Sequence, residues 1–355
     1  MMEQVGTLLW WGRFDPEYSR NRVLRAQLAK LGWKVRDFHP AVSGLGDVQA
    51  QWQRLQAGVA AVWVPCFRQR DMKAAARWAR RSGVPLIFDP LISAYDKQVD
   101  ERAKLAEGSW RAQRLLAWER KIFSLADRVV ADTPAHADYF QQVLGVPRER
   151  LSVLMVGAEE GLFSPCPAQQ ENKPLEVLFY GSFIPLQGPQ VIVDAARCCA
   201  DKDVVWTLLG DGPLRESCEQ AAKGLENVRF EDWVPYEQLP QSICKADILL
   251  GIFGTTTKAG RVVPNKAYQA LASGRPLVTR SSNAYPREVL EAQDSGISWV
   301  PAGDAEALAR CLEVLAADGK GLSLRGEQAA ATSERWFSNE MIAHQLEAIL
   351  GEVRA

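Results

Sequence analysis

The chain has 355 residues, a formal net charge of −1 and a pI near 6.4. This length predicts two domains, because single cores stop growing at roughly 250–300 residues, and the balanced charge argues against a uniformly basic nucleic-acid-binding protein. No apolar run reaches the roughly 18 residues that span a membrane, and no basic segment opens the chain as in a signal peptide, so we expect a cytoplasmic protein.

The first domain is predicted from short apolar runs that alternate with helix-spaced apolar residues. Strands that alternate with helices favour a parallel sheet covered on both faces. Strands are expected at 5–11, 34–39, 59–64, 85–89, 128–131 and 151–156, and helices at 18–31, 71–81, 99–126 and 135–144. We therefore assign residues 1–165 to an N-terminal α/β domain.

A second α/β series follows a linker at 166–173, which is rich in proline and polar residues. Strands are expected at 175–180, 204–209, 228–231, 248–252, near 278 and at 299–300, and helices at 189–200, 214–223, 236–245, 264–273 and 305–316. The second domain spans 174–333. A terminal helical segment is expected within 334–355.

The cysteines give no sign of a disulfide framework. The chain has seven of them, an odd number without a C-x-x-C pair, and most lie in apolar segments. Reduced core cysteines of a cytoplasmic protein explain them better than disulfides or a zinc site.

The stretch from Gly251 to Val278, GIFGTTTKAGRVVPNKAYQALASGRPLV, carries the strongest ligand signal. It predicts a strand end, a Gly/Thr-rich loop with Lys258, and a helix opened by Pro264. A helix N-terminus in this place presents unpaired N–H groups to an anion. Lys266, in the first turn, opposes the helix dipole unless an anion lies nearby. This favours a nucleotide diphosphate ligand; the alternative is a solvated surface lysine.

Two further strand-to-helix turns contain paired glycines. Gly181 and Gly188 follow the strand EVLFY, and Gly210 and Gly212 follow VVWTLL. Each glycine permits a positive φ or a close backbone approach, so each turn can admit a phosphate or a sugar ring, although such glycines also serve folding alone. Because parallel strands end at one edge of a sheet, we expect the three turns to converge on one crevice.

The order of these motifs resembles a known family. The chain contains YGSFIPLQG, LLGDGP, ADILLGIF and ALASGRPLV in this order, preceded by SLADRVVADTPAHADYF and VGAEEGLFSP. Over roughly 126–316 this series is similar to the retaining glycosyltransferases of family 4. The resemblance implies the GT-B fold: two Rossmann-like parallel-sheet domains facing a central cleft, with a C-terminal helix packing back toward the N-terminal domain.

The resemblance also implies an activity of the hexosyltransferase type. A sugar would pass, with retention of anomeric configuration, from a nucleotide-diphosphate sugar on the second domain to an acceptor on the first. The acceptor would be a sugar, a lipid-linked sugar or a small molecule, as in cell-envelope polysaccharide biosynthesis. No cofactor and no metal are expected, and the D-x-D sequence Asp201–Asp203 is interpreted as a solvated turn.

The chain departs from the family pattern at four positions. Ser182 and Gln187 replace an arginine and a lysine that contact the donor diphosphate, and Arg261 and Gln269 replace paired glutamates. Gln269 can still hydrogen-bond a ribose hydroxyl. We interpret three residues as substitute cations: Lys258, Arg261 and Lys266. The alternatives are a catalytically inactive sugar-nucleotide-binding relative and a GT-B-fold nucleotide-sugar epimerase.

The expected site residues fall into three groups. The catalytic residues are Asp89, Lys258 and Lys266. The donor-binding residues are Gly181, Ser182, Phe183, Gln187, Gly210, Gly212, Thr255, Arg261, Asn265, Lys266, Gln269 and Glu288. The acceptor-binding residues are Arg13, Arg20, Asn21 and Asp96. Asp89 ends a strand, where a carboxylate would orient the acceptor or help deprotonate it, or would cap a turn.

Positive charge is concentrated in the first domain. Up to Pro165 the chain has 24 basic and 18 acidic residues, about +6, and the remainder has 18 and 25, about −7. The helix MKAAARWARRSG places Trp78 among Arg77, Arg80 and Arg81, which is typical first of an amphipathic surface helix. A second interpretation is attachment to an anionic membrane, with Trp78 at the interface.

Overall fold

A computed structural model describes residues 5–102, 104–167, 174–199 and 203–354. The chain forms two compact units: unit 1 comprises Met1–Gly157 and Asn339–Ala355, and unit 2 comprises Ala158–Ser338. Most of the expected linker 166–173, and Asp201 with Lys202 of the D-x-D sequence, lie outside the described residues.

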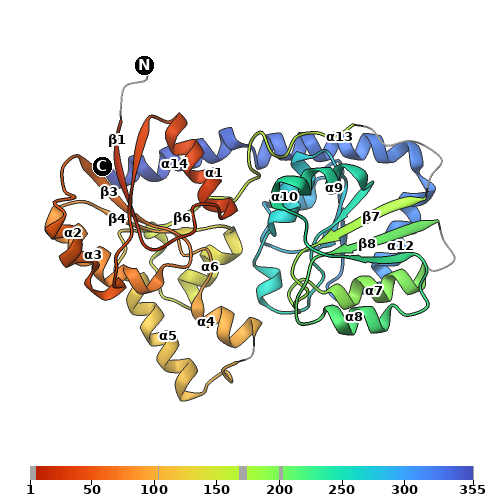
Figure 1. Ribbon diagram of the computed structural model, residues 1–355, viewed down its shortest axis with the longest axis horizontal. Helices are drawn as coiled ribbons and strands as arrows, with labels where there is room; N and C mark the ends of the chain where they lie inside the picture. Colours follow the sequence, from red (N-terminus) through yellow and green to blue (C-terminus); the bar gives the residue numbers. More distant parts are fainter. Residues whose placement is uncertain (1–4, 103, 168–173, 200–202, 355) are drawn as a thin grey trace. The chain divides into compact units, whose positions relative to one another are not determined.

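Unit 1 is built on a parallel sheet of six strands in the order β2-β1-β3-β4-β5-β6 (Figure 1). The strands are β1 (Gly6–Trp11), β2 (Trp33–Phe38), β3 (Val59–Val64), β4 (Leu86–Phe88), β5 (Arg128–Ala131) and β6 (Leu151–Val153). The α-helices are α1 (Ser19–Lys30), α2 (Gly46–Trp52), α3 (Met72–Ser82), α4 (Ala94–Asp96), α5 (Trp110–Phe123), α6 (Pro134–Gln142) and α14 (Asn339–Arg354). The short 3₁₀ helices are η1 (Ser43–Leu45), η2 (Gln69–Asp71) and η4 (Arg148–Arg150), and η3 (Lys97–Glu101) is a π-helix.

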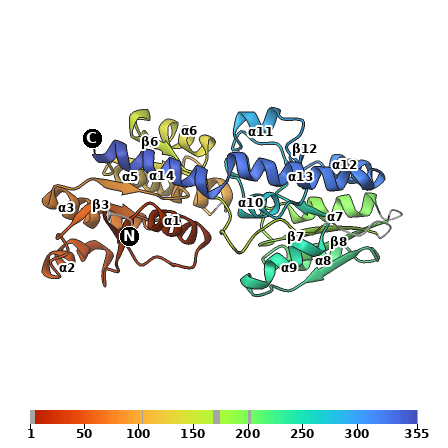
Figure 2. The same cartoon turned by 90° about the horizontal axis from the view of Figure 1, so that it is seen from above.

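The core of unit 1 lies on both faces of this sheet, because successive side chains of a strand point to opposite sides. On one face, Leu9 and Trp11 pack with α3, α5 and α6. On the other, Leu8 and Trp10 pack with α1 and α14. Figures 1 and 2 both show α14 beside α1. The C-terminal helix therefore packs back on the first unit, as expected.

Unit 2 has a second parallel sheet of six strands in the order β12-β11-β10-β7-β8-β9. The strands are β7 (Leu175–Tyr180), β8 (Val204–Leu209), β9 (Val228–Glu231), β10 (Ile248–Leu250), β11 (Leu277–Arg280) and β12 (Ile297–Val300). The helices and turns are α7 (Pro189–Cys198), α8 (Arg215–Ala221), η5 (Tyr236–Gln238), α9 (Leu239–Lys245), η6 (Lys258–Gly260), α10 (Asn265–Ala272), α11 (Arg287–Glu291), α12 (Ala305–Ala317) and α13 (Gly319–Trp336). Side chains of α7, α8 and α12 pack on β7 and β8. The expected α/β class with two Rossmann-like parallel-sheet units is confirmed.

The helix expected over 99–126 is interrupted. The π-helix η3 ends at Glu101, and α5 begins only at Trp110. Gly108 turns the chain with φ +73°, and the Ser109 hydroxyl accepts a hydrogen bond from the Ala112 N–H as the N-cap of α5. The single terminal helix expected from about residue 334 is likewise divided, because α13 ends at Trp336 before α14 begins.

The expectation that every cysteine is reduced is wrong for two of them. Cys166 and Cys244 form a disulfide, although 78 residues separate them. Arg275 brings their segments together, because its Nη2 donates at 2.9 Å both to the Pro167 carbonyl and to the Cys244 carbonyl. The sequence spacing of the cysteines does not predict this pairing, because the segments are joined by Arg275, which is distant from both cysteines in sequence.

The interfacial role considered for Trp78 is also wrong. Trp78 is fully buried, and its ring centroid lies 5.9 Å from that of Trp11. Arg77 and Arg81 both form ion pairs with the Asp47 carboxylate, at 2.7 Å for Arg77. The helix keeps its tryptophan in the core and its arginines outside. Among the helices that the structure describes, none combines the length and hydrophobicity of a membrane-spanning segment.

Candidate functional site

Three loops meet at the carboxyl edge of the unit 2 sheet, after β7, β8 and β10, as the glycine pattern predicts. A Cβ atom on Gly210 would lie 2.2 Å from the Gly181 carbonyl oxygen, and one on Gly188 would lie 2.6 Å from the Gly254 nitrogen. Gly212 has φ +154°, and a Cβ there would lie 2.6 Å from the Phe183 nitrogen. Only glycine tolerates such approaches, so these glycines let the loops pack backbone to backbone.

Lys266 is the buried cation of this edge. It lies in the first turn of α10, which begins at Asn265 with Pro264 as its N-cap, one residue later than expected. Its Nζ donates to Gln187 Oε1 at 2.6 Å and lies 3.8 Å from the Phe179 ring centroid. A Cβ atom on Gly181 would lie 3.0 Å from the same nitrogen. Lys266 thus faces an amide, an aromatic ring and glycine backbone.

The surroundings of Lys266 disfavour its charge. The residue is 4% exposed and forms no ion pair with any residue in the described part of the chain. Burial lowers the pKa of its ammonium group well below the usual range. A buried ammonium without a carboxylate is costly, and an anionic ligand would relieve that cost.

A chain of hydrogen bonds holds Gln269, one turn further along α10. Its Oε1 accepts from the Tyr180 hydroxyl at 2.7 Å, and its Nε2 donates to the Tyr236 oxygen at 2.8 Å. Tyr236 in turn donates to Glu159 Oε1 at 2.7 Å. Burial, with Tyr236 and Glu159 nearby, raises the pKa of Tyr180 well above its usual range. Both ends of the Gln269 amide are therefore occupied by tyrosines.

Sequence reasoning did not identify Tyr180, Tyr236 or Glu159. One signal was available for Tyr180, because it ends β7 directly before Gly181. Another was available for Glu159, which lies in the segment VGAEEGLFSP already noted for its family resemblance. Tyr236 follows a Val-Pro pair and has no comparable signal.

The remaining residues expected to bind the donor differ in their burial. Lys258 is buried in η6, Arg261 and Asn265 are half-buried, and Ser182, Thr255 and Glu288 are exposed. Thr255 lines a cavity of about 650 Å³ whose walls also contain Arg280, Ser282 and Trp299 but not Lys266. The residues that the structure brings together are Gly181, Phe183, Gln187, Gly210, Gly212, Lys266 and Gln269.

In unit 1, the expected acceptor residue Arg20 is the partner of the expected catalytic residue Asp89. The Arg20 Nε donates to both carboxylate oxygens, at 2.9 and 2.8 Å, and its Nη1 donates to the Leu154 carbonyl at 3.0 Å. Both residues are 0% exposed. Burial raises the pKa of the Asp89 carboxyl, and the Arg20 guanidinium opposes that rise. In this arrangement the carboxylate binds its own chain.

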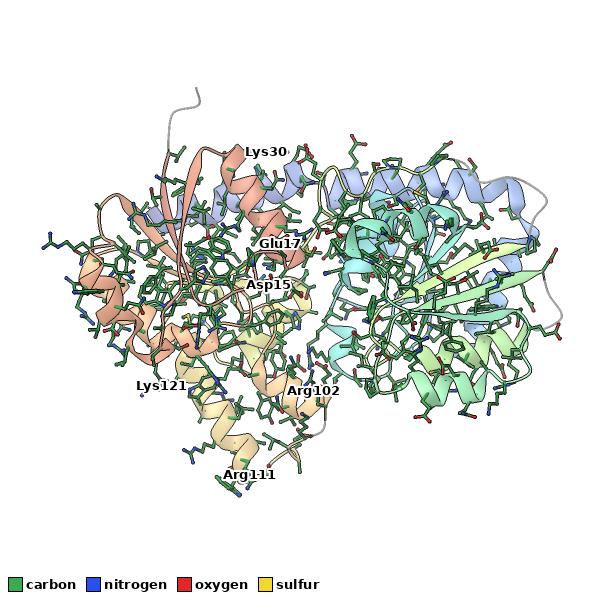
Figure 3. The ribbon with its side chains drawn as sticks, viewed as in Figure 1. Asp15, Glu17, Lys30, Arg102, Arg111 and Lys121 are labelled. Atoms are coloured by element: carbon green, nitrogen blue, oxygen red, sulfur yellow. A yellow bond between two sulfur atoms is a disulfide. The ribbon has the colours of Figure 1, made fainter. Side chains whose placement is uncertain are left out.

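The other acceptor candidates are also held by neighbours, with one exception. Asn21 donates to the Asp15 carbonyl at 2.7 Å, in the loop after β1 where Figure 3 labels Asp15. Asp96 is buried, with Oδ2 3.9 Å from His136 Nε2. Arg13 is exposed in the loop after β1. Of the four candidates, only Arg13 presents its side chain to solvent.

Two families match the chain, one for each unit. Residues 12–157 match the family described as Glycosyl transferase 4-like domain. Residues 174–318 match the family described as Glycosyl transferases group 1. Together they cover the unit 2 sheet with the three loops at its edge, and the unit 1 sheet except β1.

Known proteins resemble the chain in sequence and in fold. A protein of Escherichia coli (strain K12) that carries the name colanic acid biosynthesis glycosyltransferase WcaL is 30% identical over 220 residues, 59% of this chain and 53% of its own length. The chain thus spans about half of that relative. The Anabaena protein Alr3699/HepE, solved in complex with UDP, is 16% identical with a TM-score of 0.72 over 98% of this chain and 100% of its own. Sucrose-phosphate synthase from Thermosynechococcus elongatus is 17% identical with a TM-score of 0.73 over 96% of this chain and 97% of its own.

Proposed function

We propose that this chain, which joins a glycosyl transferase 4-like domain to a domain of the glycosyl transferases group 1, transfers a sugar from a nucleoside-diphosphate sugar to an acceptor. The observation that carries the proposal is Lys266, a buried ammonium at the edge where three glycine loops meet, with no carboxylate partner among the described residues. A diphosphate placed there supplies the missing negative charge.

In the proposed reaction, unit 2 binds the donor. The Lys266 ammonium and the N-terminal N–H groups of α10 stabilise the diphosphate as negative charge develops on it during departure. Gln187, which holds the ammonium at 2.6 Å in this structure, gives the lysine a polar partner before the donor arrives. Lys258 and Arg261, in and directly after η6, are proposed as further cations toward the same diphosphate.

The acceptor and the stereochemistry are proposed on the family resemblance. The acceptor is a sugar or a lipid-linked sugar that binds unit 1, and the anomeric configuration is retained. Arg13 is proposed as a direct acceptor contact because its side chain is exposed. Arg20, Asn21, Asp89 and Asp96 are proposed to shape the acceptor surface from within, since each is buried.

Nucleotide-induced thermal stabilisation tests the donor site. UDP, GDP, ADP and CDP are each added at millimolar concentration, and the melting temperature of the whole chain is recorded. We expect one or more nucleotides to stabilise the native chain and not Lys266→Met. Absence of a shift with all four nucleotides would contradict the proposal.

A catalytically inactive sugar-nucleotide-binding protein is the second candidate. The observation that favours it is Gln269, whose amide is held by Tyr180 and Tyr236 where the family has a glutamate. This candidate predicts the same thermal shift without transfer to any acceptor and without release of free sugar. Detection of either product excludes it.

A further inference from the structure

The cavity of about 650 Å³ in unit 2 has a polar wall that the proposed transfer does not use. Its walls come from the loop after β10, the end of β11 with the residues that follow it, α11 and β12. Five of its lining residues carry hydroxyl groups: the threonines at 255–257, Ser281 and Ser282. Its volume lies within the roughly 300–1,000 Å³ that is usual for small-molecule sites. We name it the Arg280 cavity.

Arg280, the last residue of β11, gives this cavity a cation without a counter-ion. Its Nη1 donates to the Gly254 carbonyl at 2.6 Å, and its Nε donates to the Ser281 carbonyl at 3.3 Å. Its Nη2 donates to no residue in the described part of the chain, and none of the described residues that line the cavity is acidic. Burial lowers the pKa of the guanidinium group. An anionic ligand would supply the charge that the walls lack.

Two of the hydroxyl groups hold the walls in place. The Ser282 hydroxyl donates to the Gly260 carbonyl at 2.8 Å, which ties the segment after β11 to the end of η6. The Thr256 hydroxyl accepts from the Ala259 N–H at 3.2 Å. These bonds fix the loop after β10 against the end of β11, so the cavity is already formed without a ligand.

The other polar groups are available to a ligand that both donates and accepts hydrogen bonds. The side chains of Ser281 and Asn283 are exposed, and neither forms a hydrogen bond with a described residue. A hydroxyl and an amide each donate and accept, which suits the hydroxyl groups of a sugar, whereas inorganic phosphate mainly accepts. Leu290 and Trp299 are half-buried and add an apolar wall for ring carbons. The lining therefore favours a sugar over a simple inorganic anion.

The Arg280 cavity is separate from the residues around Lys266, although one loop contacts both. Neither Lys266 nor its partner Gln187 lines the cavity. The carbonyl of Gly254 accepts from Arg280, while a Cβ atom on Gly254 would lie 2.3 Å from the Pro185 carbonyl oxygen in the loop after β7. The backbone at Gly254 therefore lies between Arg280 and the loop that holds Gln187.

We propose that the Arg280 cavity binds a sugar that carries a negative charge, at the same time as the nucleotide binds near Lys266. The Arg280 guanidinium pairs with the anionic group, Ser281 and Asn283 bind ring hydroxyls, and Trp299 contacts ring carbons. A phosphate ester and a carboxylate both provide this charge, and the test below distinguishes them. The inference does not rest on the proposed transfer, because it concerns other residues.

Calorimetric titration of the full chain tests the proposal. Glucose, galactose and mannose are each added as the neutral sugar, as the 6-phosphate and as the uronic acid, and inorganic phosphate is added alone. We expect at least one charged sugar to bind more tightly than its neutral form and than phosphate. The tighter of the two charged forms identifies the anionic group.

Variants of the walls assign the binding to this cavity. Arg280→Gln should weaken the binding of the charged sugar by about tenfold or more, because a charge-assisted hydrogen bond is lost. Ser281→Ala/Asn283→Ala should weaken it by about threefold to tenfold. The matched control Gln220→Ala/Gln241→Ala removes two exposed polar side chains from α8 and α9 and should bind as the native chain does.

Two further measurements separate this site from the donor site. Lys266→Met should bind the charged sugar with native affinity, and UDP should not displace it. The melting temperature reports the folding of each variant; if Arg280→Gln does not fold, Arg280→Lys, which keeps the charge, should retain most of the binding. The proposal is overturned if no charged sugar binds, if inorganic phosphate binds equally well, or if UDP displaces the sugar. Native affinity in Arg280→Gln or in Ser281→Ala/Asn283→Ala also overturns it, whereas absence of a UDP shift contradicts the donor site alone.

Discussion

Both units hold a buried cation at the carboxyl edge of a parallel sheet, but they surround it differently. In unit 1, Arg20 meets Asp89 through both carboxylate oxygens and also binds the Leu154 carbonyl. In unit 2, Lys266 meets the Gln187 amide and the face of Phe179. The first cation is neutralised by its own chain. The second has no carboxylate partner among the described residues, and this difference is the reason why we propose the anion site in unit 2.

The largest effect is expected from breaking the neutralised pair. Arg20→Met leaves the Asp89 carboxylate buried without its counter-ion, and should lower the free energy of unfolding of unit 1 by about 3–5 kcal/mol. Denaturation in urea measures the loss. The control Arg20→Met/Asp89→Leu removes both charges and should recover much of it. A loss below about 1 kcal/mol in the single variant would mean that Asp89 is not dependent on Arg20, and would return Asp89 to a direct role on the acceptor.

Removing Lys266 should lower activity and leave stability unchanged or raised, the opposite of the effect expected at Arg20. Lys266→Met should lower sugar transfer by about 10²–10³-fold, the cost of removing one preorganised group that stabilises developing charge. The melting temperature without nucleotide should stay unchanged or rise, because a buried ammonium is replaced by an apolar chain of similar length. The control is Gln113→Ala, a change of an exposed residue on α5 in unit 1, which should leave sugar transfer unchanged. Unchanged transfer would remove Lys266 from the donor site.

The pH dependence of stability sharpens the same contrast. The Lys266 pKa is lowered in the folded chain, so between the folded and unfolded pKa values the unfolded chain binds the extra proton. The charged Lys266 therefore lowers the free energy of unfolding most at pH values below the folded pKa. This penalty decreases as the pH rises through the folded pKa, and it is absent above the unfolded pKa. Compared with Lys266→Met, the native chain should gain stability as pH rises. Diphosphate binding should favour the charged amine and take up protons, which calorimetry in buffers of different ionisation enthalpy measures.

The disulfide distinguishes the two units in a further way. Cys166 and Cys244 both lie in unit 2 and close a loop of 78 residues. Cys166→Ser should lower the stability of unit 2 by about 2–4 kcal/mol through the larger freedom of the unfolded chain. Unit 1 should be unaffected. Hydrogen exchange resolved by unit measures both, and the control is Cys198→Ser, which replaces an exposed free cysteine of unit 2. Equal loss of protection in both units would contradict this expectation.

The smallest effect concerns the hydrogen-bond chain beside Lys266. Tyr236→Phe removes the acceptor of Gln269 Nε2 and the donor to Glu159 Oε1. Loss of these bonds should cost about 1–3 kcal/mol of stability. Donor affinity should fall by less than in Lys266→Met, because the charge remains. Thermal unfolding and nucleotide titration measure the two effects; the reverse order of affinity losses would place Tyr236, rather than Lys266, in contact with the donor.

The sequence predicts most of the strands and helices and part of the candidate site. Alternating apolar runs locate the strands of both sheets, because parallel strands are buried on both faces and read as continuous apolar segments. The glycines at 181, 188, 210 and 212 identify the three meeting loops, since close backbone packing requires them. Lys266 is identified because a lysine in the first turn of a helix is electrostatically unusual.

The remaining features depend on contacts that no local pattern encodes. Trp78 is surrounded by arginines in sequence yet lies in the core, because its partner Trp11 comes from a distant strand. Gln269 meets Tyr180 and Tyr236 from two separate elements. The α2 helix was not expected, since its apolar residues face outward and do not form the buried stripe that predicts a helix.

The place of α14 in the chain has a consequence for synthesis on the ribosome. Ile342, Leu346 and Ile349 complete the core of unit 1 beside Leu24 and Leu28 of α1. The whole of unit 2, Ala158–Ser338, is translated between these two contributions. The nascent unit 1 therefore keeps an uncovered apolar face while unit 2 emerges and folds. Unit 1 therefore reaches its native core only after the whole of unit 2 has been synthesised.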